Sequence, residues 1–186
     1  MSSETVTVQV DPQELPADSF TESDIARIEL VSWGEYRAAD FGKFAQMVSE
    51  DLAQAGDYVR QAARIVGSVE TVFLTASVIA ERVRGTSWEV IAEALRMSAA
   101  DAEKRWGDVE ARWRRTSRAD SLYRKDPGRH AASADRYITT DTPYQFTTAT
   151  RLPLSASLDA AAHLTGRDVA AADHAFAGTA CTHCSH

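Results

Sequence analysis

Near the middle of the chain stands TSWEVIAEALRMS (residues 86–98), continued by AADAEKRW (residues 99–106), and this stretch decides how the remainder is interpreted. Thr86 and Glu89 have the spacing of a capping box, in which a hydroxyl accepts a hydrogen bond from a free backbone N–H and a carboxylate reaches back to the cap residue. Ser98 and Asp101 repeat that spacing one helix later. Two helix starts so close together predict a helix of about three turns, a tight turn, and a second helix that begins at Ser98.

Both expected helices have an apolar face with helical spacing. The inward residues of the first helix are Ile91, Ala92 and Leu95, and Met97 fills the turn. In the second helix, residues spaced four, three and four apart form the inward row, which is Ala102, Trp106, Val109 and Trp113. The opposite row begins mixed in charge and becomes basic toward its end: Asp101, Arg105, Asp108, Arg112 and Arg115. The pattern predicts a surface helix that buries its tryptophans and presents its arginines outward.

This segment resembles the helix-turn-helix of small bacterial regulators, in particular the Ser-Trp-x-x-Ile-x-x-x-Leu-x-Met-Ser pattern of actinobacterial proteins similar to sigma-factor region 4. The resemblance covers about 20 residues. It implies structural roles for the residues at the buried positions and at the helix crossing, which are Trp88, Ile91, Leu95, Met97 and Ala102. It also implies that Ser98 caps the DNA-reading helix close to a phosphate and that Arg105 is a basic residue on that helix.

Three departures from the family pattern bear on DNA reading. Arg96 stands where the family usually has Gly in the turn, and a residue with a Cβ adopts a left-handed conformation at a higher cost. Ala99 and Ala100 stand where Arg and Gln are frequent, although base-edge readout depends mainly on Arg, Lys, Asn and Gln. Asp101 and Glu103 add negative charge where a phosphate or a base edge would lie. The alternative is therefore a tri-helical domain without sequence-specific readout.

The distribution of charge singles out the same region. The whole chain has a net charge of −7, which argues against a non-specific nucleic-acid coat. Residues 1–80 carry 13 acidic and 5 basic side chains, whereas residues 81–129 carry 12 basic and 9 acidic ones. Because phosphate contacts dominate nucleic-acid affinity, we expect any bound DNA to contact residues 81–129.

The expected fold is all-α: a helical bundle in residues 22–126 that contains a tri-helical helix-turn-helix unit, with the motif at residues 86–106. Hydrophobic residues make up 44% of the chain, which is enough for a real core. Residues 1–21 are expected to be a flexible arm, because Pro12 and Pro16 follow a short alternating stretch. Residues 127–186 are rich in Ala, Thr and Ser, and they are expected to be a partly disordered tail with one or two weak helices.

Capping residues and glycines place the helix boundaries in the first half. Thr21 and Asp24 predict a helix start, and Gly34 is expected to interrupt that element. Ser68 is expected to cap a later helix that packs behind the motif. Gly85 is expected to end this later helix, because it takes a positive φ at no steric cost.

Between these elements, the apolar spacing predicts one long helix from Phe41 to Val66, with Gly56 inside it and its end at Gly67 or Ser68. This helix is longer than a minimal tri-helical domain needs. Part of its apolar face is therefore available to a second copy of the chain, and a homodimer is a hypothesis.

The chain ends in a cluster of ligand-like side chains, Cys181, His183, Cys184 and His186. Thiolates and imidazoles suit zinc, and His163 and His174 would complete a site with the two cysteines. A structural zinc site usually draws its ligand pairs from separated segments, whereas these four are crowded into residues 181–186. We therefore favour a tail with incidental thiols, without a metal site and without a cofactor.

No catalytic pattern is visible, since the sequence has no phosphate-binding glycine-rich loop, Gly-x-Ser-x-Gly elbow or His-Glu-x-x-His motif. We expect a non-enzymatic and cytoplasmic protein that does not enter a membrane, because no apolar run of about 18 residues and no signal-peptide pattern occurs. The leading hypothesis is a helix-turn-helix DNA-binding transcriptional regulator whose contacts to DNA come from Ser98, Lys104, Arg105, Arg112 and Arg115. The alternative is a helical interaction module that binds a protein through its acidic first half or its long apolar helix.

Overall fold

The computed structural model describes residues 9–51, 53–141 and 152–169. These residues are mostly helical and contain no strand, so the all-α expectation is confirmed. The α-helices are α1 (Glu22–Ser49), α2 (Asp57–Ser68), α3 (Leu74–Val83), α4 (Trp88–Leu95), α5 (Ala99–Arg115), α6 (Leu122–Lys125), α7 (Pro127–Arg136) and α8 (Ala162–Thr165). Two π-helical turns, Val69–Phe73 and Tyr137–Asp141, and two 3₁₀ turns, Leu154–Ser157 and Asp159–Ala161, complete the order.

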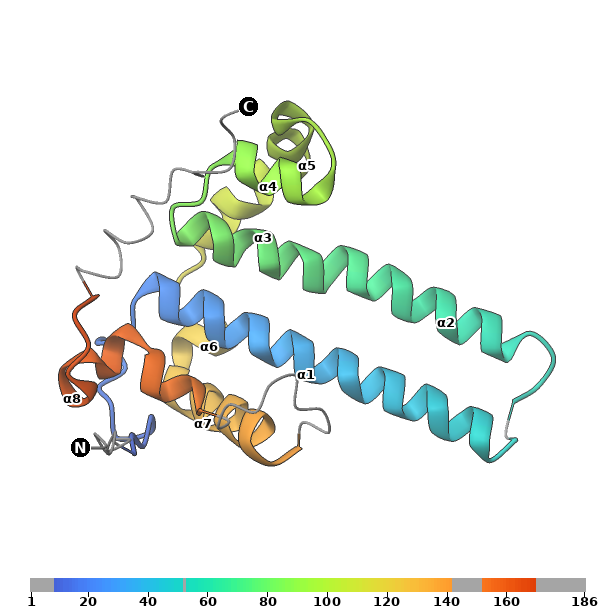
Figure 1. Cartoon of the computed structure of the whole chain (residues 1–186), viewed down its shortest axis with the longest axis horizontal. Helices are drawn as coiled ribbons and strands as arrows, with labels where there is room; N and C mark the ends of the chain where they lie inside the picture. The colour runs from blue at the N-terminus through green and yellow to red at the C-terminus, as the bar shows by residue number, and fades with distance from the viewer. Residues whose placement is uncertain (1–8, 52, 142–151, 170–186) are drawn as a thin grey trace, which may run out of the picture.

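A long helical hairpin dominates the molecule, with α1 running one way and α2 and α3 returning beside it (Figure 1). The single helix expected from Phe41 to Val66 is wrong, because the chain reverses between α1 and α2. Gly56 lies at this reversal with φ +85°, which favours glycine, and it precedes α2 instead of weakening a helix interior. Gly34 does not interrupt α1, which is continuous from its Thr21–Asp24 capping box to Ser49.

The returning arm of the hairpin is continuous from α2 through the π turn Val69–Phe73 into α3. Ser68 has helical backbone angles and makes no capping hydrogen bond, so the expected helix start at Ser68 is wrong. Among the described residues, Asp57–Val83 is the one helical stretch long and apolar enough to cross a membrane by length and composition, and an 18-residue window within it has a mean hydropathy of 1.5. In the described structure this stretch also supplies core residues, since Ile65 and four residues of α3 are buried: Ala76, Val78, Ile79 and Ala80.

Helices α3, α4 and α5, here called the three-helix unit, surround one apolar cluster. Its buried members are Val78, Ile91, Ala92, Ala102 and Trp106, and the partly buried residues around them include Trp88, Leu95 and Met97. Gly85 ends α3 with φ +91°, as expected. The capping box expected from Thr86 and Glu89 is wrong, because the Thr86 hydroxyl donates to Glu81 at 2.6 Å. Ser87 is the cap position of α4, and its side chain makes no capping hydrogen bond to the backbone.

A second group of elements, here called the base, consists of residues 9–21, the first turns of α1, and residues 122–141 and 152–165. Its apolar cluster joins Ile28 to residues far along the chain: Ala131, Ala134, Leu154 and Leu158. The flexible arm expected for residues 1–21 is wrong for residues 9–21, because Val10 and Leu15 are buried against Ala160 and Ala161. The expected boundary at residue 126 is wrong as well, since Asp126 caps α7 and Pro127 lies in its first turn.

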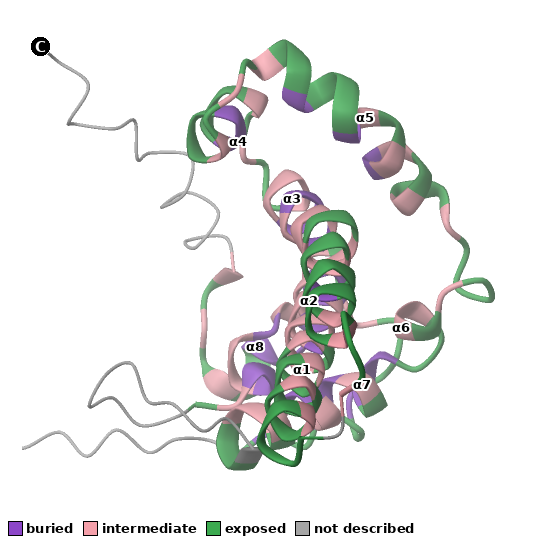
Figure 2. Cartoon of the chain, turned by 90° about the vertical axis from the view of Figure 1, so that its right-hand side faces the viewer, coloured by how far each residue is buried: buried purple, intermediate pink, exposed green. Residues whose placement is uncertain are grey.

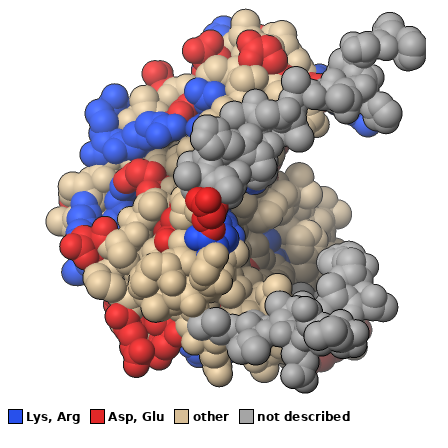
Figure 3. Space-filling view, turned by 60° about the vertical axis from the view of Figure 1, so that its left-hand side comes forward, with Lys and Arg blue, Asp and Glu red and all other residues tan. Residues whose placement is uncertain are grey.

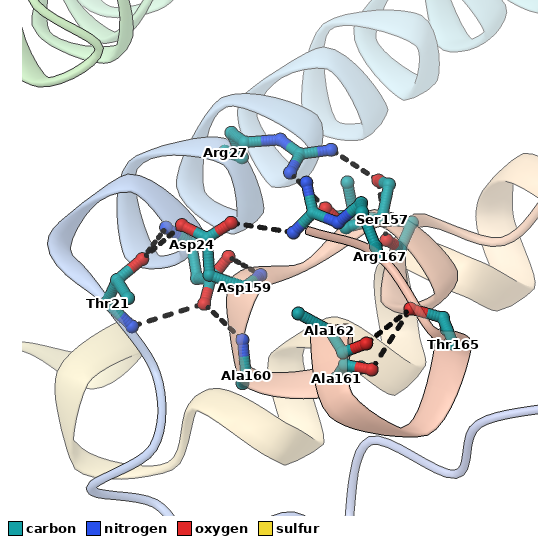
Figure 4. A network of polar contacts seen from close by, with 11 residues as sticks. Thr21, Asp24, Arg27, Ser157, Asp159, Ala160, Ala161, Ala162, Thr165 and Arg167 are labelled. Atoms are coloured by element: carbon teal, nitrogen blue, oxygen red, sulfur yellow. Dashed lines mark hydrogen bonds and ion pairs between the residues drawn. The ribbon is translucent and has the colours of Figure 1, made fainter. Parts of the chain in front are cut away.

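Asp24 connects the two ends of the described chain in the base (Figure 4). Its side chain is fully buried, and its two carboxylate oxygens accept hydrogen bonds from the backbone N–H groups of Asp159 (2.7 Å), Ala160 (3.0 Å) and Thr21 (3.1 Å). Burial raises the pKa of Asp24, and these backbone donors oppose the rise. Arg27 adds a bond of 2.7 Å to the carbonyl of Ser157. The C-terminal described segment is therefore held against the start of α1.

Candidate nucleic-acid interface

The candidate interface is the outer face of α5, whose inner face closes the cluster of the three-helix unit. Trp106 is buried and Trp113 is half-buried, so the inward tryptophans lie where the sequence predicts them. Figure 2 shows α5 with its exposed face turned away from the rest of the molecule. The five residues predicted to contact DNA are all exposed: Ser98, Lys104, Arg105, Arg112 and Arg115. Helical spacing places Lys104, Arg105, Arg112 and Arg115 on one face of α5.

Ser98 caps α5 as the sequence predicts. Its hydroxyl oxygen accepts a hydrogen bond from the backbone N–H of Asp101 at 3.1 Å and donates to the Asp101 carboxylate at 2.6 Å. The turn before it is closed by Arg96, whose φ of +55° lies in the left-handed region. The left-handed conformation expected at Arg96 is therefore confirmed.

The basic residues on α5 differ in what they contact. Arg105 makes an ion pair of 2.9 Å with Glu70 in the π turn, and its guanidinium lies 4.6 Å from the centre of the Trp106 ring. Both partners of this ion pair are exposed, so the pair is worth little and can exchange for another anion. Lys104, Arg112 and Arg115 make no side-chain ion pair with any part of the chain that the structure describes.

Arg114, on the same helix, is held by the protein itself. The buried Glu110 accepts hydrogen bonds from Arg114 at 2.9 and 3.0 Å and from Arg82 at 3.1 Å. Arg82 also donates to the carbonyl of Thr86 at 2.6 Å and stacks over Trp88 at 4.5 Å. Sequence reasoning missed this cluster, although the spacing of Glu110 and Arg114 is that of an ion pair one helical turn apart. The cluster fixes α5 to α3 and to the loop before α4.

The far end of α5 is attached to the hairpin and to the base. The Trp113 indole N–H donates to Glu29 of α1 at 2.8 Å, and Arg124 stacks on the Trp113 ring at 4.5 Å. Arg124 in turn forms an ion pair with Glu22 at the start of α1. Together with the Glu110 cluster, these contacts fix the C-terminal part of α5 to α3, α1 and α6.

Acidic side chains lie among the basic ones on this surface. Asp101, Glu103 and Asp108 are all exposed on α5. Figure 3 shows basic side chains gathered on one flank of the molecule, with acidic side chains beside them. The face is mixed in charge near the N-terminus of α5 and becomes basic toward Arg112 and Arg115.

Comparison with known proteins found no matching family model, no matching curated protein and no matching solved structure. Within the described ranges, no group of three or more His, Cys, Asp or Glu side chains is arranged to hold a metal ion. The cluster from Cys181 to His186 and His174 lie outside the described residues. His163 lies in α8 and is exposed.

Proposed function

We propose that the chain is a non-enzymatic, cytoplasmic DNA-binding protein, a transcriptional regulator in which α4 and α5 form a helix-turn-helix. The observation that supports this best is the arrangement of α5: its inner row closes the core of the three-helix unit, while Lys104, Arg112 and Arg115 stand exposed without ion-pair partners among the described residues. A helix held in this way presents positive charges that can neutralise the phosphates of a DNA backbone.

The same face predicts how DNA is bound. The N-terminal turn of α5 carries Ala99, Ala100 and Asp101, which offer none of the long donor side chains that read base edges. Phosphate contacts position a protein on the duplex but carry no sequence information of their own. We therefore expect binding that is strongly salt-dependent, and we expect any preference among sequences to come from residues beyond this first turn of α5.

Fluorescence anisotropy with a mixed-sequence DNA duplex at several salt concentrations tests the proposal. The double variant Lys104→Ala/Arg115→Ala should reduce the slope of log affinity against log salt by about two units, roughly one for each lost phosphate contact. Arg129→Ala is the matched control, because Arg129 is an exposed arginine on α7, away from this face. If the wild-type chain does not bind the duplex at low salt, or if Arg129→Ala changes the slope as much, the proposal is wrong.

The hairpin supports a second candidate function, a protein-interaction module. Large apolar side chains are exposed along its far end: Phe41, Val48, Tyr58, Val59 and Val66. Exposed apolar groups gathered in one region are typical of surfaces that bind a protein. Sedimentation velocity tests whether this surface binds a second copy of the chain. In that case the wild type is a dimer, and the double variant Val59→Ser/Val66→Ser is a monomer.

A further inference from the structure

An open hollow of about 300 Å³ lies between α1, the π turn, α3 and α5. Glu29 and Trp33 of α1 form one wall, Thr71 and Val72 of the π turn form another, and Arg112 and Trp113 of α5 close it. This volume is at the lower end of the range of pockets that hold small molecules. The wall contributed by the π turn is notable, because π-helical turns inside α-helices occur frequently at functional sites.

The lining of the hollow is mainly apolar. Trp33 and Trp113 are half-buried and come from different helices, and Ala76, Ile79 and Val109 add aliphatic surface between them. Two indole rings on opposite elements favour a flat, aromatic occupant, because aromatic pairs gain free energy beyond the area that they bury.

Two charged groups at the hollow define what else the occupant carries. Both indole N–H groups donate to Glu29, Trp113 at 2.8 Å and Trp33 at 3.4 Å, which fixes the carboxylate in the wall. An ionised carboxylate has about four acceptor sites, so Glu29 can still accept from a ligand hydroxyl or N–H. The exposed guanidinium of Arg112 has no ion pair among the described residues, and its planar fork matches a carboxylate.

We propose that this hollow binds a small aromatic carboxylate whose ring carries a hydroxyl or N–H donor. The ring lies between Trp33 and Trp113, the carboxylate binds Arg112, and the ring donor points to Glu29. A neutral analogue binds more weakly because it lacks the ion pair with Arg112. A cationic analogue that keeps its ring donor on Glu29 places its positive charge beside Arg112, so it also binds more weakly than the carboxylate.

The position of the hollow predicts that the ligand affects DNA binding, an expectation that rests on the proposed function. Arg112 belongs both to the hollow and to the outer face of α5, so a ligand carboxylate and a DNA phosphate compete for one guanidinium. The π turn that lines the hollow also carries Glu70, the ion-pair partner of Arg105. A bound carboxylate is therefore expected to weaken DNA binding.

Isothermal titration calorimetry of the full chain with 4-hydroxybenzoate tests the binding site. We expect saturable binding of one equivalent, which Arg112→Gln weakens about tenfold or more. The matched control Arg115→Gln removes a cation from the same helix outside the hollow and should leave the affinity unchanged. Val72→Phe fills the hollow and should abolish binding, while the thermal unfolding midpoint of each variant verifies that it folds. Absence of saturable binding, equal losses in both arginine variants, or equal affinity for tyramine would overturn the proposal.

A competition experiment separates the site from the regulation. Adding 4-hydroxybenzoate to the DNA complex should lower DNA affinity in the wild type and leave it unchanged in Val72→Phe. If the chain binds 4-hydroxybenzoate but no DNA, the hollow stands and the proposed function fails. If it binds both without competition, the regulatory part is wrong.

Discussion

The three-helix unit and the base are built in opposite ways. The cluster of the three-helix unit draws its buried members from residues 78–106, a short stretch in which capping residues and helical spacing lie close together. The cluster of the base joins Ile28 to Leu154 and Leu158, across most of the chain. The three-helix unit is therefore organised by residues close together in the sequence, whereas the base depends on contacts between distant residues that no local sequence pattern predicts.

The polar groups of the two regions follow the same division. Ser98 and Asp101, three residues apart, satisfy each other at the start of α5. Asp24 instead satisfies two backbone donors that lie 135 and 136 residues further along the chain. Loss of the buried Asp24 carboxylate would leave these N–H donors without an acceptor. We therefore expect substitutions of such buried groups in the base to lower the free energy of unfolding more than substitutions of local helix caps.

Replacing the buried carboxylate should have the largest effect. Asp24→Ala leaves the N–H groups of Asp159, Ala160 and Thr21 without their acceptor, and it should lower the free energy of unfolding by roughly 3 kcal/mol. Urea denaturation followed by circular dichroism measures the change. Asp18→Ala, an exposed acidic residue of the base, is the control and should change it little. Equal stability of both variants would show that the C-terminal segment does not depend on this carboxylate.

A smaller effect is expected where residues 9–21 lie against α7. A Cβ at Gly128 would lie 2.5 Å from the carbonyl oxygen of Pro12, so Gly128→Ala forces the two segments apart and should cost about 2 kcal/mol. Gly42→Ala in α1 is the matched control, because a Cβ there meets nothing within 4 Å, and it should stabilise the helix by up to about 1 kcal/mol. If both variants unfold at the same urea concentration, residues 9–21 do not pack on α7 in solution.

The same division explains how much the sequence predicts. It predicts the core residues Ile91, Ala92, Ala102 and Trp106, the caps at Thr21 and Ser98, and the positive φ of Arg96, since each is set by neighbours within a few residues. It does not predict the packing of Val10 and Leu15, because their partners Ala160 and Ala161 belong to a stretch that is apolar without a marked pattern.

For the candidate interface, the sequence identifies which residues face outward but not which of them are already paired. Lys104, Arg112 and Arg115 are indistinguishable from Arg105 in the sequence pattern. Glu70 lies in the π turn and Arg105 lies in α5, 35 positions further along the chain, so the two residues meet only in the folded structure. The hollow beside Arg112 is missed for the same reason, since its walls come from three separate segments.

The strained turn of the three-helix unit gives an effect of opposite sign. Arg96→Gly removes the Cβ at φ +55°, and it should raise the free energy of unfolding by about 1 kcal/mol. Gly85→Ala, at φ +91°, makes the reverse change in the same unit and should lower it by a similar amount. If Arg96→Gly is not stabilising, the turn before Ser98 does not adopt the left-handed conformation in solution, and the helix-turn-helix proposal loses its geometry.

The smallest effect on stability is expected from the titration of Tyr123 in α6, which reports on the contact between the base and the three-helix unit. Burial raises its pKa to about 12, and the negative charge of Glu29 adds to the rise. Glu29 is also the acceptor for Trp113, so Tyr123 senses the contact that attaches α5 to α1. Because the pKa is raised in the folded state, the stability linked to Tyr123 is fully present below pH 10 and is lost as the pH rises through about 12.

The difference in tyrosinate absorbance between the wild type and Tyr123→Phe isolates this titration. It should show a midpoint near pH 12 in the folded protein and near the ordinary tyrosine value of about 10 in urea. Trp113→Phe, which removes the indole N–H but keeps an aromatic ring, should shift the folded midpoint downward if it loosens this contact and lets water reach Tyr123. A midpoint near pH 10 in the folded wild type would mean that α6 is solvated, in which case the base and the three-helix unit do not meet as described and α5 is not fixed at its basic end.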